Sequence, residues 1–170
     1  MKKLLSVLII GVLPSFAMAS GDHAGGHDMQ GAHDMKDMEG MSHGEHDAAL
    51  GKPGDPAKVD RTVEITMNDT MRFTPDKIAV KSGETIRFFI RNAGKMPHEM
   101  VIGSMAELKE HAAMMRKMPN MQHSDPGMIK LAAGQRGGIV WQFDKPMSVD
   151  FACLIPGHME AGMVGQIEAK

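Results

Sequence analysis

The chain has few cysteines and few aromatic residues. Its 170 residues include one cysteine, one tryptophan, six phenylalanines and no tyrosine. Because a disulfide needs two thiols, the lone Cys153 excludes an internal disulfide. It also lies far from the N-terminus, where a lipid anchor would need a cysteine. Cys153 is therefore a buried residue without a chemical role, a partner in an intermolecular disulfide or a metal ligand. The residues around it in the sequence are needed to choose among these roles.

The chain also lacks a basic cluster. Residues 20–50 carry seven acidic residues and one lysine, and residues 51–170 carry 16 basic and 14 acidic residues. Nucleic-acid binding needs a clustered basic footprint, so we expect no nucleic-acid partner. No spaced pair of carboxylates and no nucleophile with an adjacent base is visible, which leaves no set of residues for acid–base or nucleophilic catalysis.

The first 19 residues, MKKLLSVLIIGVLPSFAMA, have the features of a signal peptide. Lys2 and Lys3 precede a short apolar run, which ends at small residues of the kind that a signal peptidase recognises. The short run and the cleavage-like site favour an exported protein over one with a retained membrane anchor. We therefore expect a periplasmic protein without a stable membrane anchor.

Methionine and histidine are abundant in a segment that has little apolar bulk. Residues 20–50 contain five of the nine histidines, and His-Asp-Met occurs at 27–29 and again at 33–35. Such a segment cannot offset its own ordering entropy, so we expect residues 20–58, including the linker GKPGDP, to form a disordered tail. Thioether favours Cu(I) and imidazole binds copper in both states, so the tail is a candidate copper-binding segment. The alternative is a solvated acidic tail.

The character of the sequence changes at Val59. Short segments rich in β-forming residues follow one another, with turn residues between them: VEITM, KIAV, ETIRFFIRN, GGIVWQFD, SVDFACLI and MVGQIEA. Strands of this length and spacing predict an all-β antiparallel sandwich or barrel. Residues 59–170 are sufficient for one such domain.

One segment interrupts the strands. Residues 104–118, SMAELKEHAAMMRKM, have a helix-forming composition. Ser104 and Glu107 have the spacing of a capping box, in which each side chain accepts a hydrogen bond from the other residue's backbone. Pro119 is placed to end the helix. We therefore expect a short helical, methionine-rich insertion in the β-domain.

This helix would place several soft ligands on one face. His111, Met114 or Met115, and Met118 are three or four residues apart. Residues 111–128 are therefore a second candidate copper-binding segment. A methionine stripe at helical spacing is equally typical of a packing face, and the sequence does not separate the two interpretations.

The clearest candidate site is CLIPGHMEAGM, residues 153–163. Cys153, His158 and Met163 follow one another at five-residue intervals, and a proline and two glycines between them allow a tight bend. Thiolate and imidazole are good copper ligands, and a weak axial thioether completes the electron-transfer form of a copper site. The spacing therefore predicts that this loop binds copper.

Such a site needs a second histidine from another strand. His98, in RNAGKMPHEMVI, follows a glycine-containing turn and a proline and is the natural candidate. The predicted copper ligands are therefore His98, Cys153, His158 and Met163. Met96, Met100 and Met159 lie beside the two histidines and could compete with Met163 for the axial position.

The block RFTPDKIAVKSGETIRFFIRNAGKMPHEM, followed about fifty residues later by C-x4-H-x4-M, resembles the cupredoxin family of type 1 copper proteins. The resemblance covers the chain from about residue 60 to residue 170. It implies a Greek-key β-sandwich of about eight strands, with copper near one end held by the four ligands named above. A His/Met-rich tail before such a domain resembles the small exported cupredoxins that bacteria use in copper tolerance.

Three functions follow from these features. The first is a copper-tolerance protein of the periplasm that holds one redox-active type 1 copper, with further copper on the tail and on residues 111–128. The second is a soluble electron carrier that serves a redox partner such as a cytochrome. The third, an enzyme, would need a second copper centre, and no H-x-H pattern supplies one; we therefore expect no enzymatic activity.

Overall fold

The computed structural model describes residues 50–118 and 124–170. The predicted signal peptide at 1–19 and most of the predicted tail therefore lie outside the described residues, as do residues 119–123 of the second candidate copper-binding segment. No helix in the described parts of the chain is long and apolar enough to cross a membrane.

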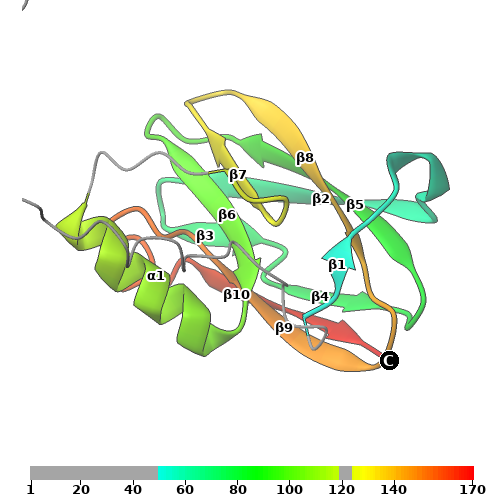
Figure 1. Ribbon diagram of the computed structural model, residues 1–170. Helices are drawn as coiled ribbons and strands as arrows, with labels where there is room; N and C mark the ends of the chain where they lie inside the picture. Colours follow the sequence, from blue (N-terminus) through cyan, green and yellow to red (C-terminus); the bar gives the residue numbers. More distant parts are fainter. Residues whose placement is uncertain (1–49, 119–123) are drawn as a thin grey trace, which may run out of the picture. The chain divides into compact units, whose positions relative to one another are not determined.

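The described chain forms two five-stranded β-sheets that pack face to face (Figure 1). The first has the order β1-β8-β5-β2-β3, formed by Lys52–Pro53, Arg136–Gln142, Thr85–Asn92, Arg61–Asn68 and Arg72–Thr74. The second has the order β4-β10-β9-β6-β7, formed by Lys77–Val80, Val164–Ala169, Met147–Ala152, His98–Gly103 and Met128–Leu131. The predicted all-β sandwich is confirmed.

Buried and exposed side chains alternate along the strands, and the buried ones form the core between the sheets. In β5, the side chains of Ile86, Phe88 and Ile90 are fully buried, and the residues between them are exposed. Burying each of these side chains stabilises the fold by about 1.5–3 kcal/mol. Phe73 of the first sheet meets Phe151 of the second edge to face, with ring centroids 5.0 Å apart, so aromatic packing joins the two sheets.

Two details of the sheets differ from the sequence prediction. The described residues form ten strands, because a two-residue β1 and a three-residue β3 add to the longer ones. The sheets are also mixed, since β2 runs parallel to β5 and β4 runs parallel to β10. Between β2 and β5 the chain crosses to the second sheet to form β4, and it returns to pair beside β2 in the same direction. Apolar alternation reports which face is buried but not which strand is the neighbour.

The segment that the sequence predicts as a linker begins the ordered fold instead. Lys52–Pro53 pairs with β8, and the indole nitrogen of Trp141 donates a hydrogen bond of 2.8 Å to the carbonyl of Leu50. Gly51 has a φ of +85° and lies so close to Trp141 that a Cβ there would be 2.6 Å from the indole nitrogen. Only glycine fits this position, and its presence reflects close packing rather than flexibility.

The predicted helix is confirmed as α1, Met105–Lys117. Ser104 is its N-cap: its hydroxyl accepts a hydrogen bond of 3.3 Å from the backbone N–H of Glu107. The Glu107 carboxylate in turn accepts one of 2.9 Å from the backbone N–H of Ser104, so the capping box is complete. The helix ends before Pro119, as predicted.

A small core of its own fixes α1 against β6 and β9 (Figure 1). We call this the helix cluster; its buried members are Val101, Leu108, Ala112, Ala152 and Leu154. Cys153 lies between two of these residues in sequence, yet its side chain belongs to the main core between the sheets. The backbone around Cys153 is therefore packed from both sides.

Candidate metal centre

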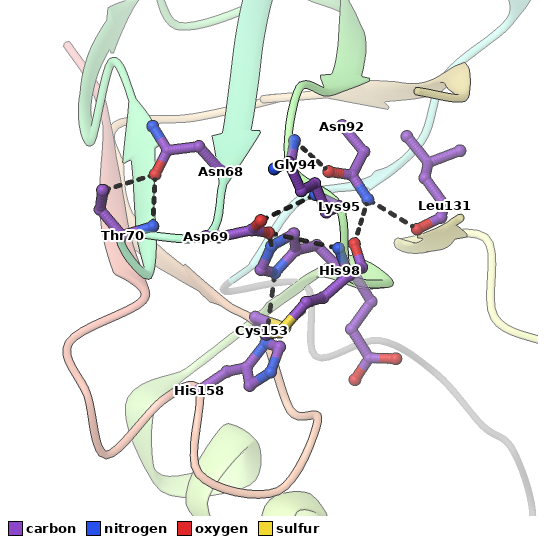
Figure 2. Close-up of polar contacts among 12 residues, drawn as sticks. Asn68, Asp69, Thr70, Asn92, Gly94, Lys95, His98, Leu131, Cys153 and His158 are labelled. Atoms are coloured by element: carbon purple, nitrogen blue, oxygen red, sulfur yellow. Dashed lines mark hydrogen bonds and ion pairs between the residues drawn. The ribbon is translucent and has the colours of Figure 1, made fainter. Parts of the chain in front are cut away.

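Three of the four predicted ligands meet in the structure. His98 begins β6, Cys153 directly follows β9, and His158 lies in the loop before β10 (Figure 2). The Nδ1 atom of His158 is 3.2 Å from the Nδ1 atom of His98 and 3.2 Å from the sulfur of Cys153. The three donor atoms lie within 4.8 Å of one another, and the residues are 0%, 0% and 8% exposed in chain order.

Asp69 orients the first histidine. Its Oδ1 atom is 3.1 Å from Nε2 of His98, and the carboxylate also accepts hydrogen bonds from the backbone N–H groups of Lys95, at 2.8 Å, and Met96, at 3.3 Å. The hydrogen bond from Lys95, followed by that from His98, lowers the pKa of Asp69. A carboxylate on Nε2 holds the proton there and leaves the lone pair of Nδ1 facing Cys153 and His158, which is the usual support for a metal-binding histidine.

Glu99 links the strands that carry His98 and Cys153. Its backbone N–H donates to the Cys153 sulfur at 3.4 Å, and its carboxylate accepts a hydrogen bond of 3.0 Å from the backbone N–H of Leu154. Glu99 is buried, so these contacts are shielded from water. The thiol is therefore positioned by a neighbour of the first histidine.

The protonation of the centre suits a metal ion. Burial raises the pKa of the Cys153 thiol to about 12, so a thiolate forms there only when a cation binds the sulfur. Burial, and secondly the neighbouring His98, lowers the pKa of His158, which keeps this imidazole neutral and able to donate a lone pair. One thiol and two imidazoles are a donor set that copper accepts. Full burial of Cys153 argues against an intermolecular disulfide.

Backbone hydrogen bonds close the loop between Cys153 and Met163. The Met163 N–H donates to the carbonyl of His158 at 3.0 Å, and the Cys153 N–H donates to the carbonyl of Met163 at 3.1 Å. Gly157 and Gly162 have φ values of +90° and +97°, which other residues rarely adopt. The predicted tight bend is present and returns the chain to Cys153.

The remaining methionines have distinct surroundings. Met163 is fully buried in the same core cluster as Cys153, and Met100 is also buried in that core. Met159 is half-buried against the helix cluster, and Met96 is 39% exposed. The axial role of Met163, like the ligand roles of the other three residues, stays a prediction.

The helix contributes no ligand to this group. Within residues 50–118 and 124–170, His98, Cys153 and His158 form the one group of three or more His, Cys, Asp or Glu side chains close enough to share a metal. His111, Met114 and Met115 are half-buried on α1, and Met118 is exposed. The sequence also did not indicate the parts played by Asp69 and Glu99, which depend on contacts 29 and 54 residues away along the chain.

Comparisons with known proteins agree with this chemistry. Residues 59–170 match the copper-binding proteins of the plastocyanin/azurin family. A copper-resistant cuproprotein CopI of Rubrivivax gelatinosus is 49% identical over 167 residues, which cover 98% of this chain and 94% of that protein. The CopI protein of Vibrio cholerae is 37% identical over 135 residues, covering 79% and 76% of the two chains.

Solved structures share the fold at lower identity. Reduced auracyanin from the photosynthetic bacterium Roseiflexus castenholzii superposes with a TM-score of 0.56 at 19% identity, covering 66% of this chain and 98% of that chain. The family match over the β-sandwich and the identity to the two CopI proteins extend this likeness from the fold to the sequence. The chain belongs to the plastocyanin/azurin family of copper-binding proteins, the cupredoxins.

Proposed function

We propose that this protein acts in copper tolerance in the periplasm and holds one type 1 copper at His98, Cys153 and His158, with Met163 as the axial ligand. The observation that carries the proposal is the buried meeting of one thiol and two imidazole Nδ1 atoms within 4.8 Å. Copper tolerance is supported by the names of the relatives, which are copper-resistant cuproproteins. The leader-like first 19 residues support the periplasmic location.

Copper in such a site supplies one-electron exchange between Cu(II) and Cu(I). The protein's own contribution is to hold the donors in place in both oxidation states. Asp69 fixes the ring of His98, the backbone of Glu99 holds the sulfur of Cys153, and burial keeps water out. Little then has to move when an electron arrives or leaves.

A second candidate function is soluble electron transfer to a redox partner such as a cytochrome. The observation in its favour is that His158 lines a cavity at the protein surface, so one predicted ligand is within reach of another molecule. The His/Met-rich tail favours copper handling, because an electron carrier has no need of additional copper ligands. We propose a binding role and no enzymatic one, in keeping with a family defined by copper binding.

The first test is an optical titration of the purified protein without residues 1–19. One equivalent of Cu(II) should produce an intense visible band from the bond between thiolate and Cu(II). Further copper should bind to the full tail without increasing that band. A protein that takes up Cu(II) without any such band would contradict the type 1 assignment.

The second test separates the two candidate functions in cells. A deletion strain should grow poorly at raised copper concentrations while its respiration stays normal. Normal copper tolerance combined with a respiratory defect would instead identify an electron carrier. Removal of residues 20–49 alone should lower the copper stoichiometry but keep the band, and an unchanged stoichiometry would remove the tail from the proposal.

A further inference from the structure

A cavity of about 540 Å³ lies beside the candidate metal centre, and two thioethers line it. Met96 comes from the loop between β5 and β6, and Met115 comes from α1. His158, from the loop before β10, lines the same cavity. Three segments that are distant in sequence thus bring two soft ligands and one predicted copper ligand around one space.

His158 belongs both to the metal centre and to the lining of this cavity. Its Nδ1 atom faces inward, 3.2 Å from both Cys153 and His98 (Figure 2). The Nε2 atom lies on the other edge of the imidazole ring, and His158 is 8% exposed. The two nitrogens of one ring can therefore serve a metal on either side.

Neither cavity methionine is part of the buried core. Met96 is 39% exposed, and the buried side of α1 is formed by Leu108 and Ala112 rather than by Met115. A methionine that fills a core gap is normally buried, so packing does not account for these two side chains. For Met115 this favours the ligand interpretation of the helix methionines over the packing interpretation.

The donor atoms around the cavity favour one oxidation state of copper. Two lysines and one carboxylate, Lys95, Lys130 and Glu99, also line it, so the charged side chains alone do not separate Cu(I) from Cu(II). Thioethers are neutral and soft, which suits Cu(I) and binds Cu(II) poorly. The cavity should therefore bind Cu(I) in preference to Cu(II).

We propose that the cavity is an uptake site for Cu(I), in which Met96 and Met115 hold the ion beside His158 before it passes to Cys153 and His98. The proposal deepens the proposed function and rests on it. Copper stays Cu(I) during the transfer. As the bond between copper and sulfur forms, the Cys153 thiol loses its proton to water, so no oxidant or reductant is needed.

The binding test uses Ag(I), a redox-inert substitute for Cu(I), and protein labelled with ¹³C in the methionine methyl groups. The main site is first filled with Zn(II). Titration with Ag(I) should then shift the methyl signals of Met96 and Met115 together. Met96→Leu should weaken Ag(I) binding at the Met115 signal by about tenfold, the usual scale for loss of a metal-supporting group. Met118→Leu is the matched control, because this exposed methionine directly after α1 does not line the cavity.

The transfer test measures how fast Cu(I) reaches the main site. Copper-free protein is mixed anaerobically with Cu(I) in acetonitrile, which is colourless, and samples are oxidised rapidly with ferricyanide at successive times. The visible band then reports only copper at Cys153, and the wild-type protein and the variant carry the same tail, so the two filling rates can be compared. The double variant Met96→Leu/Met115→Leu should fill about tenfold more slowly, reaching the same final band. That final band also demonstrates that the variant is folded.

The outcomes distinguish this proposal from the proposed function. Unshifted Met96 and Met115 signals, or unchanged filling of the double variant, would overturn the uptake site. The type 1 assignment would survive that result as long as the wild-type protein still shows its band with Cu(II). Absence of the band in the wild-type protein would instead defeat the proposed function itself.

Discussion

The two histidines of the candidate metal centre are held in different ways. His98 is fully buried at the start of a strand, and its second ring nitrogen contacts Asp69. His158 lies in a loop, and its ring lines a cavity. One side of the centre is thus fixed by the sandwich, whereas the other faces the surroundings. From this comparison we expect the His98 side to stabilise the site and the proposed exchange of ions or electrons to occur on the His158 side.

The largest effect is expected from removing the Cys153 sulfur, which both sides of the centre share. Cys153→Ser should abolish the visible band, because the band requires a thiolate bound to Cu(II). We expect weak binding of Cu(II) by the two imidazoles to remain, measured by competition with a chelator. A variant that keeps the intense band would show that Cys153 is not a ligand.

Replacing each histidine by glycine tests the difference between the two sides directly. His158→Gly leaves a gap at the cavity, so added imidazole, including imidazoles with long N-alkyl groups, should restore the band. In His98→Gly the gap is enclosed, and the long-chain imidazoles should fail to restore it. Optical titration with both ligand types measures the contrast, and equal rescue of the two variants would refute the asymmetry.

The buried thiol should make the metal-free protein sensitive to alkali. The folded-state pKa of Cys153, about 12, lies above the ordinary thiol value of 9.0. Between these values the unfolded state binds fewer protons than the folded state, so the free energy of unfolding falls as the pH rises. The slope should be about −1.4 kcal/mol per pH unit relative to Cys153→Ala. Urea unfolding of both proteins from pH 9 to 10.5 measures this difference, and parallel curves would contradict the assigned burial effect.

At acidic pH, the free energy of unfolding of the same metal-free protein should depend on His158. Its folded-state pKa is lowered, so below the ordinary value of 6.5 the unfolded state binds more protons than the folded state. The free energy of unfolding should therefore fall as the pH drops below about 6.5, and it should be unaffected by this group at higher pH. His158→Gln should lose that dependence in urea unfolding between pH 5 and 7.5. An unchanged dependence would assign it to other groups.

The smallest effect is expected from a substitution that changes the residue supporting His98 and removes no predicted ligand. Asp69→Asn keeps an oxygen for the backbone N–H of Lys95 but removes the negative charge beside the imidazole. Since the carboxylate makes the ring a better donor to Cu(II), the reduction potential should rise by about 60 mV, which corresponds to a tenfold change in the Cu(II)/Cu(I) balance. Asp76→Asn, at an exposed residue, is the control. Equal reduction potentials in the two variants would show that Asp69 has only a structural role.

Local patterns in the sequence predicted much of this molecule. The capping box at Ser104 and Glu107 predicted where α1 begins, because a cap depends on residues three apart. The chemistry of copper ligands selected His98, Cys153 and His158, which the structure brings together. Both predictions needed only residue type and short spacing, apart from the choice of His98.

Features that depend on distant contacts were not predictable in the same way. Gly51 looked like part of a linker, but Trp141 requires a glycine at that point. Asp69 lies in the loop between β2 and β3, and its carboxylate contacts His98, which is 29 residues away along the chain. The cavity beside His158 depends on how α1 sits against the sheet, and no periodicity in the sequence contains that information.

The packing around Cys153 has a consequence for spectroscopy. Ala152 and Leu154 belong to the helix cluster, whereas the side chain of Cys153 belongs to the core between the sheets. The helix cluster therefore constrains the backbone on either side of the thiol. If Cys153 binds copper as proposed, the colour of the copper-loaded protein should depend on the packing of Leu108, although Leu108 is not a predicted ligand.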